Sequence, residues 1–162
     1  MSHESRLTRE LRALLHSRRV AAMGTTNDEG APFVSMVPFA LAPALGCVVI
    51  HVSGLAAHTR YLNARPAVSL LVMQGEVSGE PVHALQRATV EGQARMLQPG
   101  SDTWRACRAA YLQRFPEAQG MTQLADFQFV AIEVKGARQV AGFGAARSID
   151  EEELRLALAP GQ

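Results

Sequence analysis

Lysine is almost absent from this sequence of 162 residues, because Lys135 is the only one. The formal net charge is +1, and neither a basic tail nor a basic stripe interrupts the mixture of arginines and acids. Binding to nucleic acid without sequence preference needs a dense cationic surface, since most of the affinity comes from neutralised phosphates. The composition therefore predicts a protein without a nucleic-acid partner.

Cysteine is scarce as well, and its spacing indicates no metal or redox motif. Cys47 and Cys107 lie far apart in apolar segments and form neither a CxxC pair nor a zinc spacing. We expect two buried free thiols, which fits a reducing compartment. The histidines His3, His16 and His83 have no carboxylate or cysteine at a compatible spacing, so no metal centre is predicted.

The sequence has no long apolar run that would cross a membrane as a helix. Residues 33–50 carry no charge, but Pro38, Pro43 and Gly46 divide them into two strands and a turn. Residues 1–19 are rich in arginine and acids and lack the apolar centre of a signal peptide. We therefore expect a soluble, cytoplasmic protein that has no membrane partner.

Common catalytic motifs are missing too. The sequence contains no P-loop, no GxGxxG, no HExxH and no GxSxG pattern, so the usual signatures of nucleotide hydrolysis, zinc proteolysis and α/β-hydrolase chemistry are absent. The glycines of 142–144 are not followed by a helix start and do not indicate a dinucleotide loop.

What is present is a pattern of short strands with a few helices in one domain. The first three strands are joined by short turns, which predicts an antiparallel meander. Residues 74–87 form a loop long enough to be functional. The expected strands are 20–26, 33–41, 47–52, 68–73, 88–96 and 127–135, with 136–140 as a further short strand, and the expected helices are 5–17, 55–64, 103–115 and 150–158. This pattern predicts a mainly β (α+β) domain, a closed or nearly closed antiparallel barrel of six strands with helices at its rim.

The segment 47–73 stands out because a strand ends in Ser53-Gly54 and leads directly into a short helix. The first amides of a helix have no intrahelical partner, and the helix dipole places partial positive charge there. His58, Thr59 and Arg60 add side-chain donors in the same turn. The pattern indicates either a phosphate site at a helix N-terminus or an ordinary exposed helix. His51, near a strand end, is a satisfied rim residue or a ligand.

Several motifs in a fixed order resemble one family. They are residues 20–25 (VAAMGT), 32–40 (PFVSMVPFA), 53–60 (SGLAAHTR), 66–72 (PAVSLLV), 87–92 (RATVEG) and 142–147 (GFGAAR). The chain resembles the FMN-binding split-barrel family of pyridoxamine 5'-phosphate oxidase-like proteins, nearest the haem-utilisation branch of the HugZ type. The resemblance spans residues 11–149, which we take as the core of a single domain over 1–162. Residues 150–162 would form a C-terminal helix and tail.

The resemblance implies a homodimer with two FMN sites at the subunit interface. The flavin ring would lie against Ser35, Met36 and Val37, mainly through main-chain groups. The phosphate would lie near residues Val52, Ser53, His58, Thr59 and Arg60. Arg87, which replaces a common glutamine, would reach the flavin from the partner subunit and would favour an anionic flavin or an acidic substrate. The segment that contains Phe143 would lie near the flavin edge. Without the resemblance, Arg87 is more readily explained as an exposed, solvated arginine, and Phe143 either covers a ligand or packs locally.

The sequence departs from the family pattern at three positions in the same region. Tyr61 replaces a common asparagine, Arg65 replaces a common acid, and His58 stands where most oxidases have a phosphate-binding lysine. The substrate-phosphate residues of true pyridoxamine phosphate oxidases are not recognisable.

Three functions are compatible with the resemblance. The first is an FMN-dependent oxidoreductase acting on a small-molecule substrate, in which the flavin carries the redox chemistry and no catalytic side chain is identified. The deazaflavin F420 is an alternative cofactor. The second is a haem-binding or haem-degrading protein of the HugZ type. Such proteins use a C-terminal histidine as ligand, whereas this chain has none after His83, so that His51, His58 or His83 would have to substitute. The third is a non-catalytic dimer that binds flavin.

Overall fold

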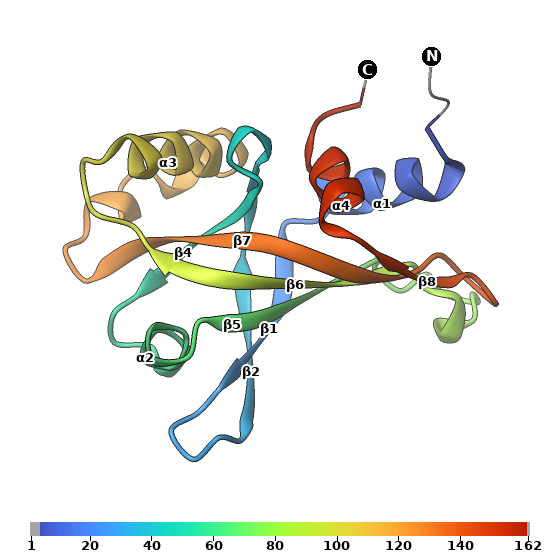
Figure 1. Cartoon of the computed structure of the whole chain (residues 1–162), viewed down its shortest axis with the longest axis horizontal. Coiled ribbons are helices and arrows are strands. Elements are labelled where there is room, and N and C mark those ends of the chain that lie inside the picture. The colour runs from blue at the N-terminus through green and yellow to red at the C-terminus, as the bar shows by residue number, and fades with distance from the viewer. Residues whose placement is uncertain (1–3, 162) are drawn as a thin grey trace.

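The computed structural model describes residues 4–161 and shows one antiparallel sheet with helices packed around it (Figure 1). The strands are β1 (Val20–Thr26), β2 (Pro32–Pro38), β3 (Ala40–Ala42), β4 (Cys47–Ser53), β5 (Ala67–Met73), β6 (Arg87–Met96), β7 (Phe127–Val140) and β8 (Ala146–Ile149). The helices are α1 (Arg6–Ser17), α2 (Ala57–Ala64), α3 (Asp102–Arg114) and α4 (Glu151–Leu158). Among the residues described, no helix is long and apolar enough to span a membrane.

The order of the strands closes the sheet on itself. The order is β2-β1-β5-β6-β7-β4-β3, with β8 added to β7. Because β2 runs directly into β3, the two ends of this order are joined by the chain itself. β2 contacts β4 but forms no ladder with it, so the barrel has a split along this line. The predicted antiparallel split barrel with flanking helices is confirmed.

Two details of the predicted barrel are wrong. The strand expected over 33–41 is divided, because Pro38 has no amide to donate and Phe39 donates its amide to the Arg19 carbonyl. The first half then pairs with β1 and the second half with β4, so the first strands do not form a simple meander. Residues 127–140 form one strand rather than two, and β8 was not expected, so the sheet has eight strands instead of six.

Arg114 at the end of α3 fixes the bend between β2 and β3. Its guanidinium donates to the carbonyls of Arg18 and Phe39, at 2.9 and 3.1 Å, and lies 5.1 Å above the Phe39 ring. Further bonds reach the carbonyls of Leu15 and His16 at the end of α1. Burial lowers the pKa of this guanidinium. The arginine therefore joins α1, α3 and the bend.

The apolar side chains form two cores, one on each face of β4. The barrel interior is closed by α1 and α4, and it contains Leu11, Met23, Ile50, Leu70, Ile132 and Leu154. A second core lies between the other face of β4 and α3, and it contains Val49, Cys107, Tyr111, Phe115 and Phe129. Burial on both faces explains why β4 is apolar along nearly its whole length.

Cys47 and Cys107 both belong to this second core, where they are buried free thiols, as the sequence predicted. Burial raises the pKa of both thiols, that of Cys107 to about 11. Both side chains are therefore protonated near neutral pH.

Candidate functional site

Ser35 and His58 meet across the split of the barrel. Ser35 lies on β2 and His58 in the first turn of α2, and Ser35 Oγ is 2.8 Å from His58 Nδ1. β2 alternates, so Ser35 and the buried Val37 point inward, whereas Met36 and Val34 point outward and are 63% and 66% exposed. This alternation brings one small hydroxyl under α2 and leaves the outer face of β2 apolar.

The surroundings of His58 favour the neutral form of its imidazole. The ring is half-buried, and this burial lowers the pKa of His58. The positive end of the helix dipole acts in the same direction, because it disfavours a cation in the first turn. Among residues 4–161 no hydrogen-bond partner is found for Nε2. The ring is therefore fixed through Nδ1 and free to use Nε2 as a ligand atom.

The hydroxyls predicted to bind phosphate are already bonded within the chain. Thr59 is buried and donates its hydroxyl to the Ser53 carbonyl at 2.6 Å. Ser53 Oγ accepts from the amide of Leu55 and lies 3.4 Å from the carboxylate of Asp126. These bonds close the turn between β4 and α2, which begins at Ala57 with no side-chain cap. They stabilise the turn rather than present donors to a ligand.

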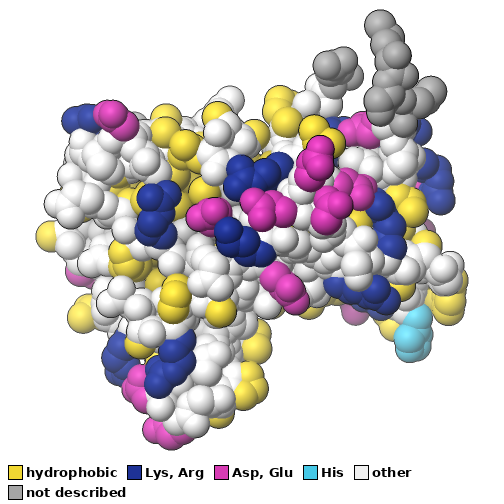
Figure 2. Space-filling model, in the orientation of Figure 1, with side chains coloured by type: hydrophobic (Ala, Val, Ile, Leu, Met, Phe, Trp, Pro, Cys, Tyr) yellow, Lys and Arg dark blue, Asp and Glu magenta, His cyan; other side chains and the backbone are white. Residues whose placement is uncertain are grey.

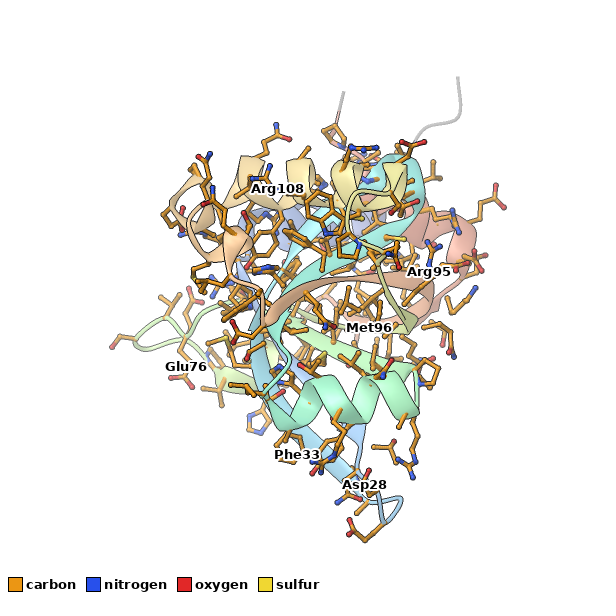
Figure 3. The ribbon with its side chains drawn as sticks, turned by 90° about the vertical axis from the view of Figure 1, so that its left-hand side faces the viewer. Asp28, Phe33, Glu76, Arg95, Met96 and Arg108 are labelled. Carbon is orange, nitrogen blue, oxygen red and sulfur yellow. The ribbon has the colours of Figure 1, made fainter. Side chains whose placement is uncertain are left out.

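The guanidinium predicted to bind phosphate is also paired. Arg60 lies 3.1 Å from the Asp28 carboxylate, which Arg65 approaches at 3.6 Å. Asp28 lies on the turn between β1 and β2, so these pairs join that hairpin to α2; Figure 3 shows Asp28 and Phe33 on the hairpin below the helix. Phe33 meets Tyr61 of α2 edge to face, with ring centroids 5.3 Å apart. All of these charged groups are partly exposed, so they remain open to exchange with a ligand.

The remaining predicted contacts occupy two different environments. Val52, like Val37, is buried in the barrel interior, so its side chain is not available to a ligand. Arg87 donates to the carbonyls of Leu85 and His83, at 2.8 and 3.4 Å. Phe143 is 75% exposed on the loop between β7 and β8, and Figure 1 places this loop at the opposite end of the molecule from α2. The chain thus brings together Ser35, His58 and their neighbours, but neither Arg87 nor Phe143.

Sequence reasoning missed Asp28, Asp126 and Phe33, which hold the region together. Asp28 and Asp126 lie in loops, where no periodic pattern marks the residues that will be neighbours. The pairing of Ser53 with Phe127 explains the position of Asp126, because it brings the start of β7 beside the end of β4. That pairing links segments distant in sequence, so local patterns do not reveal it.

A hollow of about 420 Å³ lies over β1, β5 and β6. It is lined by Thr26, Ser69, Glu91, Gln93 and Lys135, among others. In Figure 2 basic and acidic side chains lie next to one another over the middle of the molecule, and hydrophobic side chains line the side where Figure 1 places β2. In the described part of the chain, no group of three histidine, cysteine or acidic side chains is arranged to hold a metal ion.

The sequence profile of the pyridoxamine 5'-phosphate oxidase family matches residues 7–141, which is most of the chain. The chain belongs to this family. Several of the proteins to which the chain is similar carry names that refer to haem.

Heme oxygenase HutZ of Vibrio cholerae is 29% identical over 93% of this chain and 85% of its own length. The chloroplastic heme oxygenase HOZ of Arabidopsis thaliana is 33% identical over 90% of this chain, which spans only 45% of that protein. The structure of a heme binding protein from Mycobacterium smegmatis has a TM-score of 0.84 and 28% identity, over 95% of this chain and 62% of that one. These similarities support the predicted kinship with the haem-utilisation branch.

Proposed function

We propose that this protein binds haem at the split of its barrel. Haem binding, for which several of its relatives are named, describes its function better than FMN binding does. The observation that carries the proposal is that most side chains predicted to bind phosphate already make hydrogen bonds within the chain. The hydroxyls of Thr59 and Ser53 are bonded inside the chain, while the imidazole of His58 keeps one nitrogen free. The similarities to HutZ and HOZ support the same conclusion.

The residues around the split fit the chemistry of haem. A porphyrin needs apolar and aromatic surface, its propionates need cations, and its iron needs a nitrogen or sulfur ligand. Phe33 and Leu55, the latter 88% exposed, supply apolar surface near His58, and Arg60 and Arg65 supply partly exposed cations. Haem would supply the iron on which dioxygen chemistry depends, and the chain would hold and orient it. HutZ and HOZ are named as heme oxygenases, and the structure of this chain adds no separate argument for degradation of the haem.

We also propose that two copies associate through the outer face of β2, β1 and β5. The pairing of Met36 with Ala22, and of Val34 with Gly24, places exposed apolar side chains above small residues on this face. Val20 and Met73 extend the same apolar surface. A contiguous apolar face of this kind indicates an interface.

The association is tested by replacing Met36 with aspartate. We expect sedimentation equilibrium to show a dimer for the wild type and a monomer for Met36→Asp, because a charge is costly in a dry interface. Glu76→Asp, in the loop that Figure 3 shows projecting from the body, serves as control and should remain dimeric. A monomeric wild type at micromolar concentration would contradict the proposed interface.

Haem binding is tested by separate titrations of the purified protein with haemin and with FMN. We expect haemin to give a shifted Soret band that saturates at one equivalent per protomer, and FMN to show no saturable quenching of its fluorescence in the micromolar range. Stoichiometric binding of FMN with no Soret shift for haemin would instead support the flavoprotein reading and overturn the proposal.

A further inference from the structure

The chain offers few imidazoles to an iron atom, and the structure separates them clearly. Of the five histidines, His3 lies outside the described residues. His16 uses Nε2 in a bond of 2.9 Å to the Leu158 carbonyl, between α1 and the end of α4. This places it at the closed end of the barrel, next to the α1–α4 contact rather than the split.

His51 is enclosed in the second core. It is only 8% exposed, and its ring lies 4.4 Å from Phe129, 5.1 Å from Phe127 and 5.7 Å from Tyr111. A haem would have to displace this aromatic cluster to reach it. His83 is exposed on the short helical turn Val82–Ala84, and no hydrogen bond is found for its ring among the described residues. Its orientation is therefore not fixed by the chain.

His58 combines access with a fixed orientation. Its Nδ1 is held by Ser35, which lies two residues along β2 from the partly exposed Phe33, and the exposed Leu55 lies three residues before His58 in the chain. Histidines that bind metals through one nitrogen almost always have the other nitrogen in a hydrogen bond. The serine hydroxyl can accept as well as donate, so it can accept from Nδ1–H and leave the lone pair of Nε2 free. That is the tautomer that ligation through Nε2 requires.

We propose that His58 is the iron ligand of this protein, through Nε2, and that Ser35 is the positioning residue that holds its Nδ1–H. The inference rests on the proposed function. It assigns the ligand to the first turn of α2 in a chain that has no histidine after His83. The hydrogen bond between Ser35 and His58, which joins β2 to α2, would then also orient the iron ligand. The iron site would therefore lie at the split of the barrel.

The test is spectroscopic and does not depend on turnover. We expect His58→Ala to bind haemin at least tenfold more weakly and to lose the low-field electron paramagnetic resonance and Soret signature of an imidazole ligand. Added imidazole should restore that signature, because it can occupy the space that the side chain leaves. His83→Ala is the matched control and should keep the wild-type spectrum and affinity. Circular dichroism of each variant would verify that the fold is kept.

Ser35 is tested in the same experiment. Loss of a positioning partner typically costs about 10-fold to 100-fold in metal affinity. We therefore expect Ser35→Ala to weaken haemin binding by about tenfold, and Ser35→Thr, which keeps the hydroxyl, to restore most of it. A wild-type spectrum in His58→Ala would overturn the ligand assignment while leaving haem binding intact. A wild-type protein that takes up no haemin would overturn the proposed function itself.

Discussion

Replacing Gly92 with alanine is expected to lower the free energy of unfolding by about 3 kcal/mol. A Cβ at this position would lie 2.6 Å from Cγ2 of Ile132 and 2.7 Å from the carbonyl oxygen of Glu133. The second contact is with backbone, which cannot rotate away as a flexible side chain can. The φ angle of Gly92 is not positive, so the cost would come from space and not from backbone strain.

Gly92 matters because it marks the irregularity that bends β6. The register between β6 and β7 shifts between Glu91 and Gly92, as in a β-bulge. Bulges increase the local twist of a strand and help a sheet to curve into a barrel. Close approach of β7 to β6 at this point therefore requires a residue without a side chain.

Gly120→Ala is the matched control for this prediction. Gly120 has helical φ and ψ of −63° and −38°, and an added Cβ there would meet nothing within 4 Å. Alanine should therefore leave stability unchanged or raise it by roughly 0.5 kcal/mol through the unfolded chain. Urea unfolding at pH 7.5 measures both variants. Equal stabilities for Gly92→Ala and the wild type would show that the two strands are not packed as described.

Lowering the pH from 7.5 to 5 is expected to remove about 2 kcal/mol of stability through His51 alone. Burial lowers the pKa of His51 from 6.5 to about 4. Between these values the unfolded chain binds a proton that the folded chain does not bind. The loss therefore begins as the pH falls below about 6.5 and is complete near pH 4, while the contribution stays constant at higher pH.

His51→Phe separates this effect from the other titrating groups. The phenyl ring can occupy the same aromatic cluster with Phe127, Phe129 and Tyr111 but cannot take up a proton. His58, whose pKa is also lowered by burial, adds a fall of the same sign in both proteins and cancels in the comparison. The unfolding free energy of the wild type, measured relative to that of the variant, should fall by about 2 kcal/mol between pH 7.5 and pH 5. A difference independent of pH would mean that His51 is accessible to water.

Most of the fold follows from local patterns in the sequence. Alternation along β1, β5 and β6, the proline after α3 and the Asp150 cap of α4 place these elements within a few residues. Asp150 does accept from the amide of Glu153, as a helix cap should. The division of residues 33–41 into β2 and β3 was not predictable in this way. It depends on the long-range bonds of Phe39 to Arg19 and Arg114.

Only part of the candidate site could be predicted from the sequence. The segment from Ser53 to Arg60 was found because a strand leads into a helix there, and Ser35 was assigned through the family resemblance. Neither signal shows that Thr59 and Arg60 are bonded internally, because their partners, the Ser53 carbonyl and Asp28, are set by the fold. The resemblance supplied both the region in which we place the proposed haem site and the expectation of FMN, and neither follows from the bonding partners of these side chains.

The most direct test of haem binding is the identity of the cofactor that the protein carries from the cell. The protein should be purified from cells supplied with iron and a haem precursor, and the released cofactor identified by mass spectrometry and by its pyridine haemochrome spectrum. The account predicts haem in an amount approaching one per protomer, with little flavin. Release of FMN or F420 in that amount, with no haem, would contradict it.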